Sequence, residues 1–314
     1  PPEKDPVATT TDPRFPAPTS TGTVAGEHGD TWFRVTGEIA PDAEHAPLVV
    51  LHGGPGAGHN YTLMMANLAA DGRAVIHYDQ LGCGGSTHLP EAPAELWTVG
   101  LFVDELRSLV DHLGIGDRFH LLGQSWGGML GPEVVLADDS GICSLTICDS
   151  PASMDLWLQA AATLRAQLPA EVEATLSRHE ADGTTDSAGY LAAMQVFYDR
   201  HVCRVVPNPP EVHDSFAQLE AEPTVYHTMN GPSEFHVIGS LRTWSVVDRV
   251  GGISVPTLVV AGAHDEARPE VWAPFAVGIP GARTHVFPES SHMPHVEEPQ
   301  AFLDVVGAFL RDHD

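Results

Sequence analysis

Lysine is almost missing from this chain of 314 residues, since Lys4 is the only one. Lysine and arginine together number 15, against 42 aspartates and glutamates, and the formal charge at pH 7 is −27. A charge of this size repels phosphate backbones and anionic lipid headgroups. We therefore expect neither nucleic acid nor a membrane surface as a partner, and neutral or cationic small molecules fit better.

Cysteine is also scarce. The four cysteines have no C-x-x-C spacing and are too few for a disulfide scaffold, so we expect reduced thiols, no metal site and no cofactor. No apolar run approaches the ~20 residues that cross a bilayer, and the N-terminus lacks a basic-then-apolar signal pattern. These absences predict a cytoplasmic protein. The chain does not begin with methionine, so export by a removed signal stays open as the alternative.

The first 25 residues are rich in proline, threonine, serine and aspartate and hold almost no large apolar side chain. Ordering such a segment costs more conformational entropy than its burial returns, so we expect a disordered tail over residues 1–25. From Thr31 the chain alternates, with Trp32 and Arg34 on one side and Phe33 and Val35 on the other. This alternation predicts a strand exposed on one face.

Short, continuous apolar runs follow, as expected of parallel strands that are buried on both faces. They cover residues 48–51, 74–78, 119–122, 145–148 and 258–261. Helix-like stretches separate them, the clearest being 101–113, whose apolar stripe ends at Gly114. Alternating strands and helices predict an α/β fold with a mostly parallel, doubly wound sheet. We assign residues 26–150 and 243–314 to this core.

Residues 151–242 break the alternation. Helix-favouring segments cover 156–168, 170–179 and 188–200, no strand is convincing, and three prolines, Pro207, Pro209 and Pro210, are expected to break helices. This composition predicts a helical cap inserted into the core. The sheet pattern resumes at Pro256 and closes with a helix over 301–310.

A candidate nucleophile lies at residues 123–127, which read G-x-S-x-G directly after an apolar run. A serine between a strand and a helix is held at a sharp turn, and the glycines avoid collisions with neighbouring backbone. Ser125 therefore has the context of a nucleophile elbow. The bare pattern is common in chains of this length, so its surroundings must decide.

A serine nucleophile needs a base, and the base needs an orienting carboxylate. In an α/β-hydrolase sheet they follow in the order serine, acid, histidine, each after a strand. Asp265 leaves the buried strand 258–261, and His292 follows the short strand 284–287, so we expect them as acid and base. His295 is the alternative base. Asp149 also ends a strand, and we interpret it as a structural or hinge residue.

The tetrahedral intermediate of such chemistry needs two backbone N–H groups. One typically comes from the residue after the nucleophile, here Trp126, and the other from a glycine-rich loop after an earlier strand. Residues 52–56 read HGGPG and follow the strand 48–51. This position predicts an oxyanion loop, with Gly54 as the donor, rather than a simple tight turn.

Four motifs together make the pattern specific: HGGPG at 52–56, DQLGCGGS at 79–86, GQSWGG at 123–128 and GAHDE at 262–266. The set resembles the proline iminopeptidase family of serine peptidases, which includes tricorn-associated aminopeptidases. The similarity runs from about residue 30 to the C-terminus. It implies an α/β-hydrolase fold and two glutamates that bind the free α-amino group of the substrate. Glu266 matches the first, and the cap residue Glu234 matches the second.

The resemblance implies a cofactor-free serine exopeptidase that acts through an acyl-enzyme. Its substrates are short peptides or aminoacyl amides with a free N-terminus, and the released residue is proline or another small apolar one. An amino-acid amidase or esterase on the same scaffold is the alternative, and a ligand-binding protein without turnover is a more distant one. The preferred residue is not predicted, because aromatics of the cap either line a pocket or pack in its core: Trp157, Tyr190, Phe197, Tyr198 and Phe216.

Overall fold

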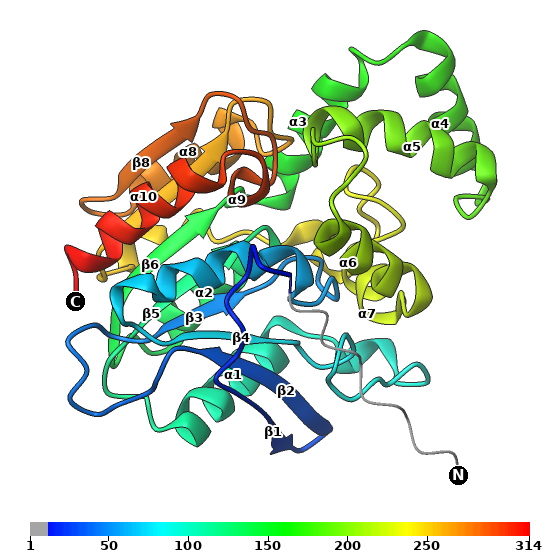
Figure 1. The fold of residues 1–314 in the computed structure, drawn as a ribbon. Coiled ribbons are helices and arrows are strands. Elements are labelled where there is room, and N and C mark those ends of the chain that lie inside the picture. The colour runs from blue at the N-terminus through cyan, green and yellow to red at the C-terminus, as the bar shows by residue number, and fades with distance from the viewer. Residues whose placement is uncertain (1–11) are drawn as a thin grey trace.

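A computed structural model describes residues 12–314 of the chain and shows one sheet of eight strands (Figure 1). In spatial order the strands are β1 (Ser20–Gly26), β2 (Gly29–Thr36), β4 (Val75–Tyr78), β3 (Leu48–Leu51), β5 (Phe119–Gln124), β6 (Ile142–Cys148), β7 (Thr257–Gly262) and β8 (Arg283–Phe287). β2 is antiparallel to β1 and β4, and all the other pairs are parallel. The predicted fold class is confirmed.

Helices cover both faces of this sheet. One face carries α1 (Val99–Leu113), α2 (Trp126–Ala137) and α8 (Pro269–Gly278), and the other carries the 3₁₀ segment η1 (Asn60–Asp71) and α10 (Pro299–Arg311). Side chains of β3 alternate between them, Val49 and Leu51 packing on the first face and Leu48 and Val50 on the second. Burial on both faces explains why the strand reads as an uninterrupted apolar run. Within residues 12–314, no helix combines the length and apolarity that crossing a membrane requires.

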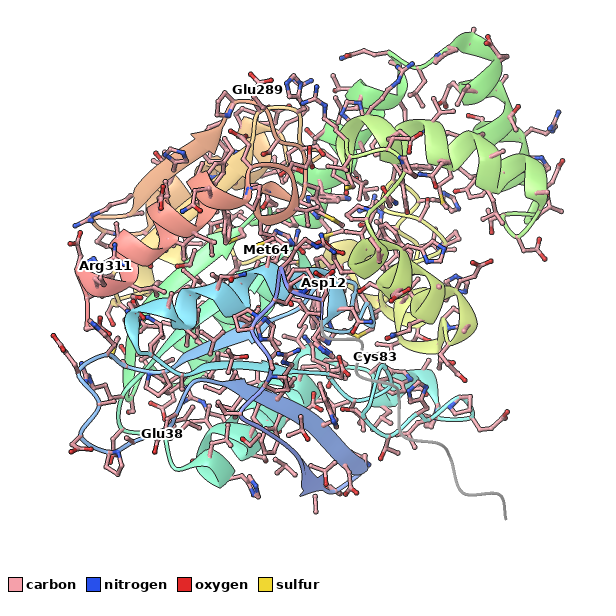
Figure 2. The ribbon with its side chains drawn as sticks, viewed as in Figure 1. Asp12, Glu38, Met64, Cys83, Glu289 and Arg311 are labelled. Atoms are coloured by element: carbon pink, nitrogen blue, oxygen red, sulfur yellow. The ribbon has the colours of Figure 1, made fainter. Side chains whose placement is uncertain are left out.

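The segment between β6 and β7 is helical, in keeping with the proposed cap over residues 151–242. It contains α3 (Met154–Arg165), α4 (Ala170–Asp182), α5 (Ala188–His201), α6 (Pro210–Ala221), α7 (Thr224–Met229) and the 3₁₀ turn η3 (Ser240–Thr243). A further turn, η4 (Val250–Gly252), leads into β7, while η2 (Ala94–Leu96) precedes α1 and the short α9 (Pro294–Glu297) precedes α10. Figure 1 shows the cap helices grouped at one side of the sheet. Figure 2 shows side chains filling the space between them and the loop that holds Cys83.

Helix α6 was not expected, because Pro209 and Pro210 were interpreted as helix breakers. Pro210 is instead the first residue of α6. The missing N–H of proline is harmless in the first turn of a helix, where backbone donors have no partner within the helix, and its fixed φ suits the helical conformation.

Two expectations about the N-terminal region are wrong. Residues 1–11 of the predicted tail lie outside the described residues, but residues 20–25 belong to β1 rather than to a disordered segment. Only Val24 of β1 is buried, so no apolar pattern marked the strand, and its ladder of hydrogen bonds to β2 holds it. β2 itself is not exposed on one face. Arg34 is buried because the preceding segment covers it, the carbonyl of Pro16 accepting from Arg34 Nη2 at 2.9 Å.

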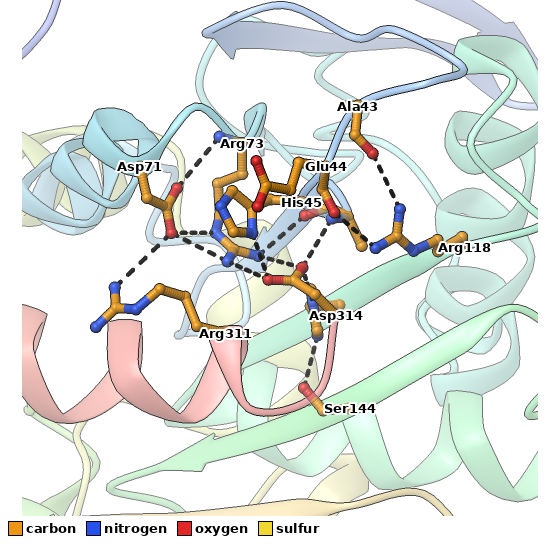
Figure 3. Close-up of polar contacts among 11 residues, drawn as sticks. Ala43, Glu44, His45, Asp71, Arg73, Arg118, Ser144, Arg311 and Asp314 are labelled. Carbon is orange, nitrogen blue, oxygen red and sulfur yellow. Dashed lines mark hydrogen bonds and ion pairs between the residues drawn. The ribbon is translucent and has the colours of Figure 1, made fainter.

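A buried charge cluster fastens the end of α10 to the sheet (Figure 3). The Arg73 side chain is fully buried, and its Nη2 lies 3.0 Å from both Asp71 Oδ2 and Asp314 Oδ2. The Asp314 carboxylate also accepts from the backbone N–H of Ala46 and lies within 3.1 Å of His45 and His120. Burial would raise the pKa of Asp314, but the hydrogen bonds from Arg73 and His120 hold it well below the usual value.

Asp314→Ala should lower the free energy of unfolding by about 1–3 kcal/mol at pH 7, because it leaves Arg73 buried with one carboxylate fewer. A group with a depressed pKa stabilises the fold above its unfolded pKa and loses this contribution as the pH falls. The difference in free energy of unfolding between wild type and variant should therefore become smaller below about pH 4. Urea unfolding at several pH values measures it. Asp312→Ala, which removes an exposed partner of Arg283, is the control, and an equal loss in it would contradict the cluster's role.

Candidate active site

The turn between β5 and α2 holds Ser125 in a conformation that L-residues rarely adopt, with φ of 55°. Close backbone contacts enforce it. A Cβ on Gly123 would lie 2.0 Å from the carbonyl oxygen of Gly127, and a Cβ on Gly127 would lie 2.0 Å from the carbonyl oxygen of Leu51. Only glycine fits at either position, so the G-x-S-x-G spacing follows from the packing of α2 against β3 and β5.

The predicted acid and base, Asp265 and His292, are in contact. Asp265 follows β7, His292 lies between β8 and α9, and Nδ1 of His292 lies 2.7 Å from Asp265 Oδ1. The backbone N–H of Ala267 also donates to Oδ1, at 2.9 Å. The carboxylate therefore favours the tautomer with a proton on Nδ1, which leaves Nε2 as the basic atom. Burial alone would lower the pKa of His292, but the charge of Asp265 and its hydrogen bond raise it overall.

Ser125 and His292 line one open cavity, together with Gly54 and Glu234. Among the described residues, His292 Nε2 has no hydrogen-bond partner, so no bond to the Ser125 hydroxyl is present. Such bonds are often long until substrate binds and tighten in the reacting complex. The arrangement is that of a nucleophile and base facing one space, and their catalytic roles stay a prediction.

Tyr61 and Gln124 belong to the site, although the sequence analysis missed them. The Tyr61 hydroxyl accepts from the backbone N–H of Gly53 at 2.6 Å and donates to Gln124 Oε1 at 2.5 Å. Gln124 Nε2 in turn donates to the carbonyl of His292 at 2.8 Å. This chain of hydrogen bonds links the glycine-rich loop to the histidine loop. Gln124 lay inside the nucleophile motif, but no signal pointed to Tyr61.

Gln80, from the second motif, links the start of the glycine-rich loop to the Trp126 side chain. Its side-chain amide donates to the carbonyl of His52 at 3.2 Å and accepts from the indole N–H of Trp126 at 2.8 Å. Within residues 12–314, the backbone N–H groups of Gly54 and Trp126 donate to no protein acceptor, as an oxyanion hole requires. Gly54 has a φ of 109° and lines the cavity.

Two carboxyl groups lie beside the histidine, that of Glu266 buried and that of Glu234 half-buried. Glu266 is 1% exposed, neither of its oxygens has a hydrogen-bond partner in the described part of the chain, and Oε1 lies 4.0 Å from His292 Nε2. Glu234 Oε1 accepts from the Tyr226 hydroxyl at 2.7 Å. Burial raises the pKa of both glutamates, and the neighbouring charges of Glu234 and Asp265 add to the effect on Glu266. Among the described residues, no arginine forms an ion pair with either glutamate, and the group beside them is the His292 imidazole.

The alternatives for acid and base lie elsewhere. His295 is buried with Nε2 3.1 Å from the carbonyl of Tyr61, and burial lowers its pKa to about 3, so it stays neutral. Asp149 accepts from the backbone N–H of Gly262 at 3.0 Å, a contact with β7 rather than with His292.

The cap supplies the apolar wall of the cavity. Phe216 is the only one of the five cap aromatics in its lining, while Tyr190, Phe197 and Tyr198 pack inside the cap and Trp157 lies edge-on to the His292 ring. The apolar lining residues are Ala57, Val202, Val212, Phe216, Leu219 and Met293. A compact apolar side chain fits such a wall.

His52, Asp79 and Cys83 place possible metal-binding atoms within 4.8 Å of one another. These atoms already have partners: Gln80 N donates to His52 Nε2, and the two Asp79 oxygens accept from His59 and Gly85. The group serves to order the second motif, and its donor atoms give no support for a metal.

Comparisons with known proteins show which proteins this chain resembles in sequence and in fold. The family model described as the alpha/beta hydrolase fold matches residues 46–299. A proline iminopeptidase from Heyndrickxia coagulans is 37% identical over 264 residues, which are 84% of this chain and 90% of that protein. The crystal structure of a Mycobacterium smegmatis proline iminopeptidase is similar with 57% identity and a TM-score of 0.84, covering 94% of this chain and 98% of that one. The crystal structure of VinJ is similar with 50% identity and a TM-score of 0.93, covering 95% and 100%.

A fluorophosphonate should label the protein covalently at Ser125, and Ser125→Ala should abolish the label. The rate should fall as the pH drops, because a protonated His292 cannot accept the serine proton. The midpoint should lie above the ordinary histidine value of about 6.5, since Asp265 raises the pKa of His292. Intact-mass spectrometry across a pH series measures the rate. Labelling that survives in Ser125→Ala would rule out this serine as the nucleophile.

Proposed function

The chain belongs to the proline iminopeptidases of the α/β-hydrolase family, and on this basis we propose that it removes the N-terminal residue from short peptides or aminoacyl amides with a free amino group. It is a serine exopeptidase that acts through an acyl-enzyme. Proline or another small apolar residue is the one released.

The observation that carries the proposal is the pair formed by the half-buried Glu234 and the buried Glu266 beside His292. Two carboxylates in a space with little water repel each other until a cation comes between them. The ammonium group of a peptide N-terminus gains charge-assisted hydrogen bonds from both, and a neutral or acylated nitrogen does not. We expect an ammonium group bound next to the base to bring the first carbonyl of the substrate near Ser125.

The reaction then follows from the geometry. The Ser125 hydroxyl attacks the carbonyl carbon while His292 Nε2 takes its proton, and Asp265 holds the imidazole through Nδ1. The N–H groups of Gly54 and Trp126 donate to the oxyanion. His292 passes the proton to the leaving amine, whose bond to carbon breaks. Water, deprotonated by the same histidine, then releases the amino acid from Ser125.

The cap explains why such an enzyme would act only at the chain end. Glu234 lines the cavity where we expect the amino group to bind, and Val212, Phe216 and Leu219 of α6 form its apolar side. A substrate with a further residue ahead of the first one would present an amide nitrogen, in place of the ammonium group, to the two carboxylates.

We place the enzyme in the cytoplasm, because its four cysteines are all free, and a reducing compartment keeps cysteines in this state.

Prolyl-, alanyl- and leucyl-naphthylamides with a free amino group should be hydrolysed, and their N-acetylated forms should not, because acetylation removes the cation that the glutamates bind. Fluorescence of the released naphthylamine measures this, with Ser125→Ala as the inactive control. The matching simple amides and esters test the amidase or esterase alternative, which gains if they react faster than the naphthylamides. Equal rates for free and acetylated substrates would contradict an exopeptidase.

Glu234→Gln should raise KM for free-amine substrates on the order of 10- to 100-fold, the loss expected of one charge-assisted hydrogen bond. Hydrolysis of a p-nitrophenyl ester without an amino group should barely change. In the wild type, KM for free amines should also rise as the pH falls through the raised pKa of the glutamates, since protonation removes their charge.

Glu220→Gln is the matched control for this variant, because Glu220 is exposed on α6 and the change removes the same charge. If Glu234→Gln slows the ester as much as the naphthylamide, the glutamate does not act by binding the amino group.

A further inference from the structure

A second aspartate lies behind Asp265. Asp149 directly follows β6, the strand that pairs with β7, and its side chain is fully buried. It is one of two non-glycine residues with a positive φ in the described chain, the other being Ser125. The backbone N–H of Asp149 donates to Val260, and Gly262 N–H donates to Asp149 Oδ1 at 3.0 Å. These bonds fix the Asp149 carboxyl group against the end of β7, where Asp265 begins its loop.

One oxygen of each carboxyl group has no hydrogen-bond partner among the described residues. Asp149 Oδ2 and Asp265 Oδ2 are both buried without a hydrogen-bond partner among residues 12–314, and the two side chains are within hydrogen-bonding reach of each other. Two ionised carboxylates have no proton to share, and their charges repel in a space without water. A single proton between the two oxygens satisfies both.

We propose that Asp149 is a neutral carboxylic acid whose Oδ2–H donates to Asp265 Oδ2, and that it is a positioning residue that holds Asp265 toward His292. This inference rests on the proposed roles of Asp265 and His292. It assigns to Asp149 a task that neither the motifs nor the family resemblance gave it.

The hydrogen bonds decide which aspartate keeps the proton. Asp265 Oδ1 receives two donors, His292 Nδ1 and Ala267 N, whereas Asp149 Oδ1 receives only Gly262 N. More donors favour the ionised form, so Asp265 carries the charge. In agreement, burial and the charge of Asp265 raise the pKa of Asp149 well above its usual value.

The other titratable groups around the pair agree with this assignment. Glu297, on α9, and Glu266, after β7, bring further negative charge, and the Cys148 thiol is held neutral by burial. Besides His292, the described chain brings His201 of α5 near Asp265; burial lowers the pKa of His201, although the charge of Asp265 opposes this. An ionised Asp149 would add negative charge where four acidic side chains already surround the His292 imidazole. These are Asp265, Glu234, Glu266 and Glu297.

The neutral acid has a consequence for the base. It orients Asp265 through a hydrogen bond without adding a negative charge, so Asp149 does not itself raise the pKa of His292. The next residue extends the link to the nucleophile, because the Ser150 hydroxyl donates to the carbonyl of Ser125 at 2.8 Å. Residues 149 and 150 therefore contact both the acid and the nucleophile turn.

Two substitutions at Asp149 test the proposal with a p-nitrophenyl ester that has no amino group. Asp149→Asn keeps the shape, the donor toward Asp265 and the acceptor for Gly262. Its kcat/KM should stay within about 3-fold of wild type, and the acid limb of its pH profile should not move, because a neutral amide replaces a neutral acid. Asp149→Ala removes the donor and should lower kcat roughly 10- to 100-fold with little change in KM.

The exposed Asp248→Asn controls for the lost formal charge. If Asp149 is ionised instead, Asp149→Asn removes a charge near the imidazole and shifts the acid limb down by about one pH unit, which overturns the proposal. Wild-type kinetics in Asp149→Ala would overturn it as well. Infrared difference spectra of wild type against Asp149→Asn at pH 7 should show the carbonyl band of a protonated acid only in the wild type, and its absence would count against the neutral form.

A failure of the proposed function can be told apart from a failure of the inference about Asp149. Asp265→Ala and Ser125→Ala should each remove most of the activity. If they do not, the proposed function is wrong, whereas if they do and Asp149 behaves as an ionised group, only the inference about Asp149 is wrong.

Discussion

The site depends on how closely the first turn of α2 approaches the strands beneath it. Gly127 touches the carbonyl of Leu51 in β3, and Gly123 touches Gly127, so a side chain at either position would push the helix away from the sheet. This contact forces Ser125 into its positive φ and sets the start of α2 beside the glycine-rich loop after β3. One packing constraint thus brings the serine and Gly54 of the predicted oxyanion loop to the same cavity.

Electrostatics links the composition of the chain to the same place. The excess of acidic residues over the whole chain reappears in concentrated form around His292, where Asp265, Glu266 and Asp149 are buried and Glu234 is half-buried. Each added carboxyl raises the cost of ionising the others, and this cost is the physical basis of the proposed cationic ligand and of the proposed neutral acid. A site built in this way gains affinity for an ammonium group through charges that are already desolvated.

The sequence predicted the central strands and the motifs because their signals are local. Continuous apolar runs mark strands buried on both faces, and the glycines of the nucleophile turn reflect contacts a few residues away. The wrong or missing predictions concern residues whose contact partners are distant in sequence. Arg34 is buried by the segment near Pro16, β1 exists because β2 offers it a ladder, and Tyr61 has no motif around it. Glu234 was predicted only through family resemblance, since nothing local shows that this cap residue lies near Glu266.

Tyr61 explains how the cap and the chemistry are joined. Its hydroxyl fixes Gly53 beside the predicted oxyanion donor, and its backbone N–H donates to Ser215 Oγ on α6 at 3.1 Å. The same helix is held from outside, where the guanidinium of Arg14 binds both oxygens of the buried Glu211 at 2.8 and 2.7 Å. A shift of α6 therefore pulls on the glycine-rich loop as well as on the apolar wall of the cavity. Because one helix contacts both, the fit of the first side chain and the placement of the oxyanion donors cannot vary independently.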